Sequence, residues 1–405
     1  DPAQPAASAY PVVRLKPGRD RPLLLGHPWV FSGALQEVPA DLAPGEVVDL
    51  HSARGEFVAR AYLNPRNSLA ARVLTDDPEQ AIDEAFFAAR IRQAAALRAS
   101  LERGDTNAYR VVHAEGDRLP GLIVDRYDRW LVAQVHTAGI ERLRTPALAA
   151  LGGVLAPEGI LLRNDLGVRA REGLPVGGVE VVAGSVPEEA VISEGGIRYY
   201  VDLRHGQKTG FFLDQRDKRA RIREHAADAR TLLNLFAYSG GFALAALAGN
   251  PALRTTNVDA SAAAMELARR NYALNGHDPA GHGFVTGDAV AYLKERVAEG
   301  ARYDVVIADP PAYAKSQASK ARALYGYDTL NTLAARVVAS GGLLLTCSCT
   351  GVVDLAEFEA VVQGALLHAR RHAQLIESFT VSLDHPTLLG FPEDRYLKAL
   401  LLRVL

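Results

Sequence analysis

Three carboxylates and one thiol follow predicted strands in the second half of this chain, where they could bind a ligand or react with one. Asp259, Asp288 and Asp309 each come after a short apolar run, and Cys349 comes after another. Open α/β sheets bind ligands at the carboxyl ends of their strands, so acids at successive strand ends are hard to explain as solvated loop residues. A thiolate is the strongest side-chain nucleophile near neutral pH. The pattern predicts a binding site with nucleophilic chemistry.

A glycine-containing turn precedes these acids. The segment Asn234–Gly241 reads Asn-Leu-Phe-Ala-Tyr-Ser-Gly-Gly and leads from a predicted strand into a helix. Glycine lets the backbone pass close to a ligand, but a tight turn with no ligand explains these residues equally well. The segment lacks the G-x-G-x-x-G pattern of dinucleotide sites, which favours a cofactor without phosphates. Asp259 lies roughly 20 residues further on, where an acid can accept both ribose hydroxyls, and Asp288 suits an adenine amino group.

Asp309 begins a loop, Asp309-Pro310-Pro311, in which each proline fixes φ and removes a hydrogen-bond donor. A rigid loop with one carboxylate could hold a flat base by its Watson–Crick edge. A helix N-cap acid followed by prolines is the common alternative, but the position after a buried strand favours the functional interpretation. Cys347 and Cys349 are too close in sequence to form a disulfide framework. We expect Cys347 to be buried and inert, and Cys349 to face the Asp309 loop.

Two further motifs do not indicate a site. His368 and His372 stand four residues apart and could grip a metal, but no carboxylate or cysteine accompanies them. A solvated helix face explains them better, so we expect no metal. The segment 206–209, Gly-Gln-Lys-Thr, is superficially like a phosphate loop. A glutamine separates its glycine from its lysine and no strand precedes it, so we reject a nucleoside triphosphate site.

Strand and helix patterns alternate strictly after Tyr199. The predicted strands are Thr231–Phe236, Thr255–Val258, Gly283–Thr286, Val305–Ala308, Gly342–Thr346 and Leu397–Val404. The predicted helices are Gly241–Ala248, Ala262–Leu274, Ala289–Glu299, Tyr327–Ala339 and Leu355–His372. Such alternation predicts an α/β fold with a doubly wound, Rossmann-like, mostly parallel sheet.

The first two hundred residues show a different pattern of predicted strands and helices. Short β-type runs broken by turns predict a small all-β barrel, with strands at Pro22–Leu25, Glu46–Leu50, Phe57–Leu63 and Leu69–Leu74. The next region is mixed α and β, with helices at Asp77–Arg103 and Arg142–Leu151 and strands at Arg110–His113, Gly121–Val124, Trp130–His136 and Gly159–Arg163. We therefore predict a disordered tail over 1–10, a β-barrel domain over 11–76, a central α+β domain over 77–195 and the doubly wound domain over 196–405.

The composition is that of a globular protein, with 48% hydrophobic and 23% charged residues in a chain of 405, long enough for two or three domains. The Ala/Pro-rich start lacks the features of a signal peptide and no apolar run could span a bilayer, so we expect a cytoplasmic protein with no membrane partner. Lys and Arg number 45 against 47 Asp and Glu, a net charge of −2. Any nucleic acid must therefore bind to a local patch rather than to a globally basic surface.

Short blocks spread over nearly the whole chain carry a family resemblance. Those in the C-terminal half are GQKTGFFLDQR at 206–216, LNLFAYSGGF at 233–242, DPPAYAKS at 309–316 and TCSCT at 346–350. These blocks resemble the bacterial 23S ribosomal RNA 5-methylcytosine methyltransferases, which are class I methyltransferases with an N-terminal PUA domain. GHPWVFSG at 26–33 and AYLNP at 61–65 are similar to that RNA-binding PUA domain, and LPGLIVDRY at 119–127 is similar to the central linking domain.

The resemblance implies S-adenosyl-L-methionine as the methyl donor and 23S ribosomal RNA, in the large subunit or an assembly intermediate of it, as the substrate. It also implies methylation at C5 of a pyrimidine, with Cys349 matching the nucleophile and Asp309 the acid that holds the base. The residues assigned to the cofactor are Phe236, Tyr238, Ser239, Gly240, Asp259, Asp288, Asp309, Gln215 and Arg216. The oligomeric state is left open, a homodimer included.

Covalent chemistry would explain the thiol. Addition of the Cys349 thiolate to C6 of cytosine, with N3 protonated or hydrogen-bonded by Asp309, makes C5 carbanion-like and able to accept a methyl group. The base that then removes the C5 proton is not identified, because the sequence has no third cysteine. Cytosine over uracil rests on the resemblance alone.

Three alternatives remain: methylation of guanine at N7, which needs no cysteine, methylation of uracil at C5, and a non-catalytic RNA-binding factor in ribosome assembly. The intact acids and Cys349 argue against the last, because a protein without catalysis does not need them. For RNA we expect a basic patch formed by Lys208, Arg216, Lys218, Arg219 and Lys315 together with the PUA-like domain.

Overall fold

The computed structural model describes residues 10–102 and 104–405, so residues 1–9 of the expected tail lie outside the described part. Tyr10, the last residue of that tail, is held by two contacts. The guanidinium carbon of Arg60 lies 4.2 Å from the centre of the Tyr10 ring, and the Tyr10 hydroxyl accepts a hydrogen bond from the Ile82 N–H at 3.1 Å. Ordered structure therefore begins no later than Tyr10.

The chain forms two compact units, and each contains segments that are far apart in sequence. The first unit consists of the residues up to Ala190, Val201–Phe211 and Leu383–Pro392. The second consists of Val191–Tyr200, Phe212–Ser382 and Glu393–Leu405. This division into two units does not test the bounds of the three expected domains, which stay a prediction.

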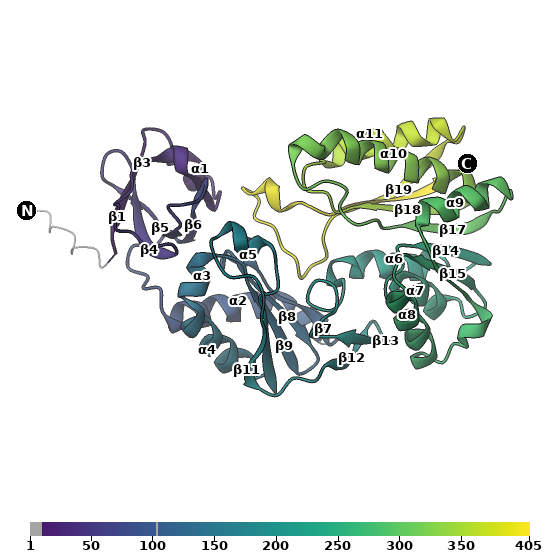
Figure 1. Ribbon diagram of the computed structural model, residues 1–405, viewed down its shortest axis with the longest axis horizontal. Coiled ribbons are helices and arrows are strands. Elements are labelled where there is room, and N and C mark those ends of the chain that lie inside the picture. Colours follow the sequence, from purple (N-terminus) through teal and green to yellow (C-terminus); the bar gives the residue numbers. More distant parts are fainter. Residues whose placement is uncertain (1–9, 103) are drawn as a thin grey trace, which may run out of the picture. The chain divides into compact units, whose positions relative to one another are not determined.

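Six strands at the start of the first unit form one sheet in the order β2-β6-β5-β4-β1-β3 (Figure 1). Their bounds are β1 Val12–Leu15, β2 Trp29–Phe31, β3 Leu35–Glu37, β4 Glu46–His51, β5 Phe57–Leu63 and β6 Leu69–Thr75. The two edge strands, β2 and β3, are joined only by the three residues of η1, Ser32–Ala34. So short a link requires the sheet to curl round, which brings alternate side chains such as Val48, Leu50 and Leu63 into a common core.

The predicted strand at Pro22–Leu25 is wrong, because this segment forms the short helix α1, Arg21–Leu24. Pro22 stands in the first turn, where a missing N–H costs nothing, and Gly26 follows the helix with φ 86°. The apolar run looked like a strand, but Leu24 and Leu25 are 71% and 69% exposed. Proline at a helix start was the signal that the strand interpretation missed.

A second sheet in the first unit has the order β11-β10-β9-β8-β7. Its strands are β7 Ala108–His113, β8 Leu122–Tyr127, β9 Trp130–Val135, β10 Gly159–Arg163 and β11 Val179–Gly184, and its helices are α2 Glu84–Glu102, α3 Ala138–Arg142, α4 Arg144–Leu155 and α5 Val168–Arg171. Phe86, Phe87 and Ile91 of α2 are buried in the core of this sheet. The helix expected over 142–151 is two helices that meet at Leu143, and β11 and α5 were not predicted.

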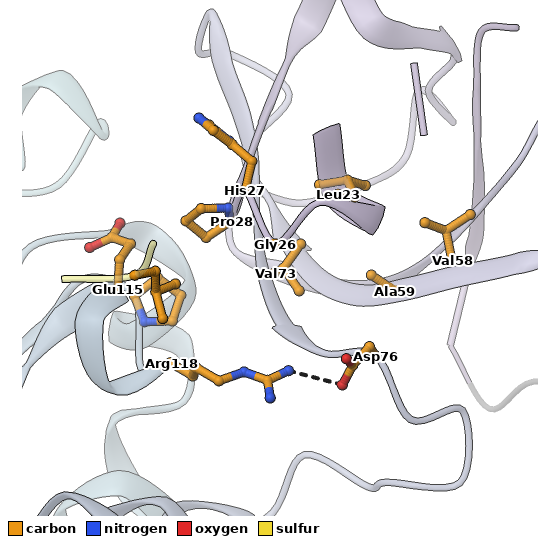
Figure 2. Close-up of a pocket in the computed structure, with 12 residues that line it drawn as sticks. Leu23, Gly26, His27, Pro28, Val58, Ala59, Val73, Asp76, Glu115 and Arg118 are labelled. Carbon is orange, nitrogen blue, oxygen red and sulfur yellow. Dashed lines mark hydrogen bonds and ion pairs between the residues drawn. The ribbon is translucent and has the colours of Figure 1, made fainter. Parts of the chain in front are cut away.

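A cavity of about 260 Å³ lies in the first unit beside α1 (Figure 2). Leu23, Val58 and Val73 form part of its wall. Arg118 and Asp76 also line it and are joined by an ion pair of 2.9 Å, in which the Asp76 side chain is 74% exposed. The cavity therefore combines an apolar wall with an ion pair that faces solvent.

The second unit contains a seven-stranded sheet in the order β16-β15-β14-β17-β18-β20-β19 (Figure 1). Its strands are β14 Thr231–Leu235, β15 Arg254–Asp259, β16 Gly283–Thr286, β17 Tyr303–Ala308, β18 Val338–Ser348, β19 Ala373–Phe379 and β20 Lys398–Val404. Its helices are α6 Arg216–His225, α7 Gly241–Gly249, α8 Ala262–Leu274, α9 Ala289–Ala298, α10 Lys320–Val337 and α11 Leu355–His368. The first five strands are parallel and β20 is antiparallel to its neighbours, which confirms the doubly wound α/β prediction.

Helix α6 and strand β19 were not predicted. Helix α6 reads RDKRARIREH and offers Ile222 as a single buried apolar residue, so no apolar stripe marks it in the sequence. Its buried face consists instead of Arg216, Lys218 and Arg219. Strand β12, Glu189–Glu194, pairs with β13, Ile197–Asp202, and Glu194 gives those arginines a partner. None of the helices in residues 10–102 and 104–405 is long and apolar enough to cross a membrane.

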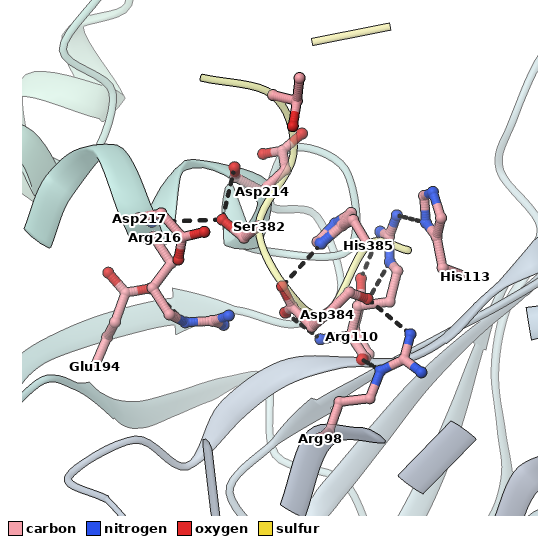
Figure 3. Close-up of polar contacts among 12 residues, drawn as sticks. Arg98, Arg110, His113, Glu194, Asp214, Arg216, Asp217, Ser382, Asp384 and His385 are labelled. Carbon is pink, nitrogen blue, oxygen red and sulfur yellow. Dashed lines mark hydrogen bonds and ion pairs between the residues drawn. The ribbon is translucent and has the colours of Figure 1, made fainter. Parts of the chain in front are cut away.

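Long-range polar contacts complete the first unit (Figure 3). Asp384, from the late segment Leu383–Pro392, accepts the Arg110 N–H on its carboxylate at 2.9 Å and an Arg98 N–H on its backbone oxygen at 2.8 Å. Arg98 is fully buried and also binds both oxygens of Asp117 at 2.7 Å. Next to Asp384, His385 packs against His113 with ring centres 5.0 Å apart. Residues close to the C-terminus are thus part of the core beside β7.

We predict that Glu194→Ala destabilises the second unit by about 3–5 kcal/mol, the cost of leaving a buried charge without its partner. Glu194 accepts two hydrogen bonds from Arg219, at 2.6 and 2.7 Å, and both side chains are almost fully buried. Glu158→Ala is the matched control, because Glu158 and Arg129 also lie 2.7 Å apart but are 53% and 59% exposed. Chemical denaturation should reveal the loss in the first variant and no change in the second. Equal stability of both variants would contradict the prediction.

Candidate active site

The predicted site residues lie in a row along one edge of the seven-stranded sheet. Asp259 is the last residue of β15, Phe236 and Asp309 directly follow β14 and β17, and Cys349 directly follows β18. Asp288 stands two residues after β16. Since these strands are parallel neighbours in the order β16-β15-β14-β17-β18, their carboxyl ends meet at the same edge. Four strand spacings of about 4.8 Å give a row roughly 19 Å long.

The turn after β14 adopts an unusual backbone conformation. Phe236 and Tyr238 have φ of 57° and 45°, in the left-handed region that residues with a Cβ rarely adopt. Such conformations cluster at functional sites and persist only where the surroundings enforce them. Here the Tyr238 N–H donates to Asp259 Oδ2 at 3.0 Å, and the Asn271 side chain donates to the Ser239 carbonyl at 3.0 Å. The turn is therefore held from outside in a shape that the local sequence does not favour.

Gly240 is required in this turn for two reasons. Its φ is 76°, and an added Cβ would lie 3.2 Å from Cε2 of Tyr272 and 3.4 Å from Cβ of Ala268. Helix α7 begins at the next residue, Gly241. The glycine thus lets α7 start close to α8 without a clash.

Asp259 is fixed by the backbone rather than by a cation. Its Oδ2 accepts from the Tyr238 N–H and its Oδ1 accepts from the Ser261 N–H at 2.9 Å. Each carboxylate oxygen can accept a further hydrogen bond. Asp288 is exposed and caps α9 by accepting from the Ala291 N–H at 2.8 Å through Oδ1. Both acids are therefore held at the edge with acceptor capacity to spare.

Gln215 fixes Asp309. It ends η3, Leu213–Gln215, is only 3% exposed, and donates from Nε2 to Asp309 Oδ2 at 2.9 Å. The Gln215 side chain also contacts the thiol of Cys347. This residue was expected near the cofactor, and its contacts in the structure are to the two neighbouring strand ends.

The two cysteines have different environments. Cys347 is fully buried, and burial raises the pKa of its thiol well above the ordinary value, as expected for a packing residue. Cys349 is half-buried, and its Sγ lies 3.8 Å from the carbonyl oxygen of Pro310 in the neighbouring loop. The structure therefore brings Cys349 to the Asp309 loop and keeps Cys347 in the strand.

A polar network holds the turn that carries Cys349. The Tyr327 hydroxyl bonds to Ser348 Oγ at 3.0 Å and to Thr350 Oγ1 at 2.7 Å, on either side of the cysteine. Thr350 Oγ1 also accepts from the Tyr313 N–H at 3.1 Å, which links this turn to the loop after β17. The two loops that carry Cys349 and Asp309 are thus tied together.

Lys398 was not predicted from the sequence, and it lies against the turn that carries Cys349. It is 3% exposed and donates from Nζ to the carbonyl oxygens of Thr350 at 2.8 Å, Val353 at 2.6 Å and Tyr396 at 2.9 Å. Burial lowers the pKa of this lysine to about 8. A single lysine in the otherwise apolar run Leu397–Leu402 was the available signal.

The prediction of a basic patch on the surface is largely wrong. Arg216, Lys218 and Arg219 are at most 7% exposed, and burial lowers the pKa of Lys218. Arg216 Nε lies 3.5 Å from Glu194 (Figure 3). Glu194 also binds Arg219, and Lys218 Nζ donates to the Asp214 carbonyl at 2.9 Å. These cations support the fold, because α6 turns them inward. Of the five expected cations, Lys208 and Lys315 are exposed.

Comparisons with known proteins agree with this geometry. A family model described as S-adenosylmethionine-dependent methyltransferase matches residues 164–370, and a PUA-like domain model matches residues 13–76. The chain is 38% identical over 399 residues to the ribosomal RNA large subunit methyltransferase I of Klebsiella pneumoniae strain 342, covering 98% of this chain and 99% of that protein. It is also 38% identical over 393 residues to the enzyme of the same name from Yersinia pestis strain Angola, covering 96% and 98%.

Solved structures share the fold. A SAM-dependent methyltransferase structure from Streptococcus mutans is 23% identical with a TM-score of 0.83, covering 97% of this chain and all of that one. A methyltransferase complexed with SAH has the same identity and TM-score and covers 97% of this chain and 99% of its own. At this identity the likeness concerns the fold alone.

We predict that Asp259→Ala weakens the binding of S-adenosylmethionine by about 2–3 kcal/mol, the scale of charge-assisted hydrogen bonds to a ligand. The substitution removes an acceptor at the edge and also releases the Tyr238 N–H that shapes the turn. Asp278→Ala is the matched control, because this exposed acid caps a turn before β16, at the other end of the strand. Titration calorimetry on both variants measures the effect, and unchanged affinity in Asp259→Ala would remove Asp259 from the site.

Proposed function

Because this chain belongs to the family of S-adenosylmethionine-dependent methyltransferases that includes the ribosomal RNA large subunit methyltransferases I, we propose that it methylates C5 of a cytosine in 23S ribosomal RNA. The observation that supports C5 chemistry is the position of Cys349. Its half-buried thiol follows β18 and lies beside the loop that begins with Asp309. Methylation of guanine at N7 needs no thiolate, so a thiol at this point favours a reaction that uses one.

The edge of the sheet fits S-adenosylmethionine, a cofactor without phosphates. Asp259 offers carboxylate oxygens for the ribose hydroxyls and Asp288 offers Oδ2 for the adenine amino group, since their other hydrogen bonds are to backbone N–H groups. The left-handed turn at Phe236 and Tyr238 brings the backbone close to the same ligand. When bound, S-adenosylmethionine supplies an electrophilic methyl group.

Cys349 and Asp309 act on the base. The Cys349 thiolate attacks C6 of cytosine, a C6–S bond forms, and the electrons of the C5–C6 double bond become available at C5. Asp309, held by Gln215, acts here as the carboxylic acid: its O–H donates to N3, and the proton moves to N3 as negative charge develops in the ring. The same proton returns to Asp309 when the adduct breaks down. After C5 is methylated, its proton leaves, the C5–C6 double bond re-forms and the C6–S bond breaks to return the thiolate. We assign no residue to the removal of that proton.

We predict that Cys349→Ala abolishes methylation and leaves S-adenosylmethionine binding nearly unchanged, because the thiol touches the base and not the donor. Cys347→Ala is the matched control and should retain most activity, since that side chain is fully buried. The unaltered protein should also form a covalent adduct with RNA that carries 5-fluorocytosine, because fluorine at C5 prevents the final loss of a proton. Radiolabelled methyl transfer and gel analysis of the adduct measure these effects.

The outcomes separate the alternatives. Substantial methylation by Cys349→Ala would rule out the covalent mechanism and favour guanine-N7 chemistry. Loss of activity in Cys347→Ala alone would mean that the other cysteine is the nucleophile. An adduct with 5-fluorouracil RNA but none with 5-fluorocytosine RNA would move the target to uracil.

RNA must bind to a local patch rather than to a globally basic surface, because the chain carries a net charge of −2. Lys315 is exposed and lies in the loop that begins with Asp309, where a phosphate beside the target base could pass. We predict that Lys315→Ala weakens RNA binding and reduces the slope of log affinity against log salt by about one. Lys294→Ala, which removes an exposed lysine of α9, is the control. Filter binding of a 23S ribosomal RNA transcript at several salt concentrations measures both, and an affinity independent of salt would contradict the prediction.

A further inference from the structure

Lys398 is a buried cation whose charge no carboxylate neutralises. Its three ammonium protons are donated to three backbone carbonyl oxygens, those of Thr350, Val353 and Tyr396. Within residues 10–102 and 104–405, no carboxylate oxygen lies within 4.0 Å of Nζ. A buried charge without an ion pair is expensive, and an apolar side chain would continue the pattern of β20. Packing alone therefore does not explain a lysine at this position.

Lys398 is next to both chain neighbours of Cys349. Strand β20 is antiparallel to β18, and Lys398 stands directly opposite Ser348, the residue before the cysteine. The Lys398 ammonium binds the carbonyl oxygen of Thr350, the residue after the cysteine. Because all three protons are engaged, the ammonium cannot swing away from this turn. A fixed positive charge thus lies beside the thiol.

We propose that Lys398 is a positioning residue for Cys349, fixing the turn that carries the thiol and stabilising its thiolate by its charge. This inference rests on the proposed function in that it takes Cys349 to react as a thiolate. A cation next to a cysteine is a general way to raise the thiolate population at neutral pH.

The surrounding charges make such help necessary. The Tyr327 phenol interacts with both Cys349 and Asp309, and so does the buried thiol of Cys347. Asp309 is also the residue before Pro310, whose carbonyl oxygen contacts the Cys349 thiol, and a carboxylate there disfavours a second negative charge. On the side of α11, Asp354 and Glu357 interact with Lys398 and favour its charged form, though more weakly than Cys349 does. Burial lowers the pKa of Lys398 to about 8, so the lysine is charged at neutral pH and loses its charge above about pH 8. Its support for the thiolate is therefore present in the neutral range.

The test uses the Cys347→Ala protein, in which Cys349 is the only thiol of the sequence. The rate of alkylation by iodoacetamide is measured from about pH 5 to about pH 10, without RNA or cofactor. We expect a midpoint below about 8.5, the value of an ordinary thiol. Adding Lys398→Met should raise the midpoint by at least about one unit and lower the rate at neutral pH about tenfold, with little change in the plateau at high pH. Lys398→Arg keeps a positive charge and should keep the low midpoint.

Three results would overturn the inference: an equal midpoint with Lys398→Met, a lower plateau without a shift in midpoint, or a midpoint at or above about 8.5 before any change at Lys398. The last measurement needs no folded Lys398 variant, and cofactor binding checks the folding of the others. The experiments also distinguish a failure of this inference from a failure of the proposed function. A low midpoint that depends on Lys398, together with full methylation by Cys349→Ala, would keep the first and remove the second.

Discussion

Parallel pairing of five neighbouring strands is the constraint on which the whole site depends. When β16, β15, β14, β17 and β18 run side by side in one direction, the residue after each strand must lie next to the residue after its neighbour. Asp309 and Cys349 are forty positions apart in the chain, yet Ala308 pairs with Thr346 and their loops meet. The antiparallel strand β20 adds a side chain from the other direction. It starts where the others end, and for this reason its first residue, Lys398, reaches the same edge.

The parts of this arrangement that follow a local rule could be predicted from the sequence. Apolar runs between helical segments predicted the sheet, and the acids and cysteine after those runs predicted its edge. The parts that depend on distant partners could not. Helix α6 buries cations because Glu194 lies against them, and no pattern within Arg216–His225 reveals that acid. The turn that contains Phe236 and Tyr238, both with left-handed φ, is likewise held by a residue from the next strand, because Asp259 accepts the Tyr238 N–H.

The buried cations of the second unit are satisfied in two chemically different ways. Arg219 has a carboxylate, whose negative charge cancels its own. Lys398 has carbonyl oxygens, which satisfy the N–H groups and leave the net charge in place. The first arrangement suits a structural role, since the pair has little field beyond its immediate surroundings. The second suits a site, since the charge acts on whatever lies beside it. The number of lysines and arginines therefore does not indicate where the electrostatic potential of this protein is positive.

The route of the chain through the first unit has a consequence for how the protein is made. Asp384 binds Arg98 and Arg110, residues that precede it by 286 and 274 positions, so these contacts form only after the long intervening chain has been synthesised. Until then the fully buried Arg98 has Asp117 but lacks its late backbone acceptor. Folding of this unit can therefore be completed only after the segment Leu383–Pro392 is available, with the slow closure that such long-range contacts impose. A nascent chain halted before Leu383 would leave the arginine side of β7 open to solvent, and hence to chaperones and proteases.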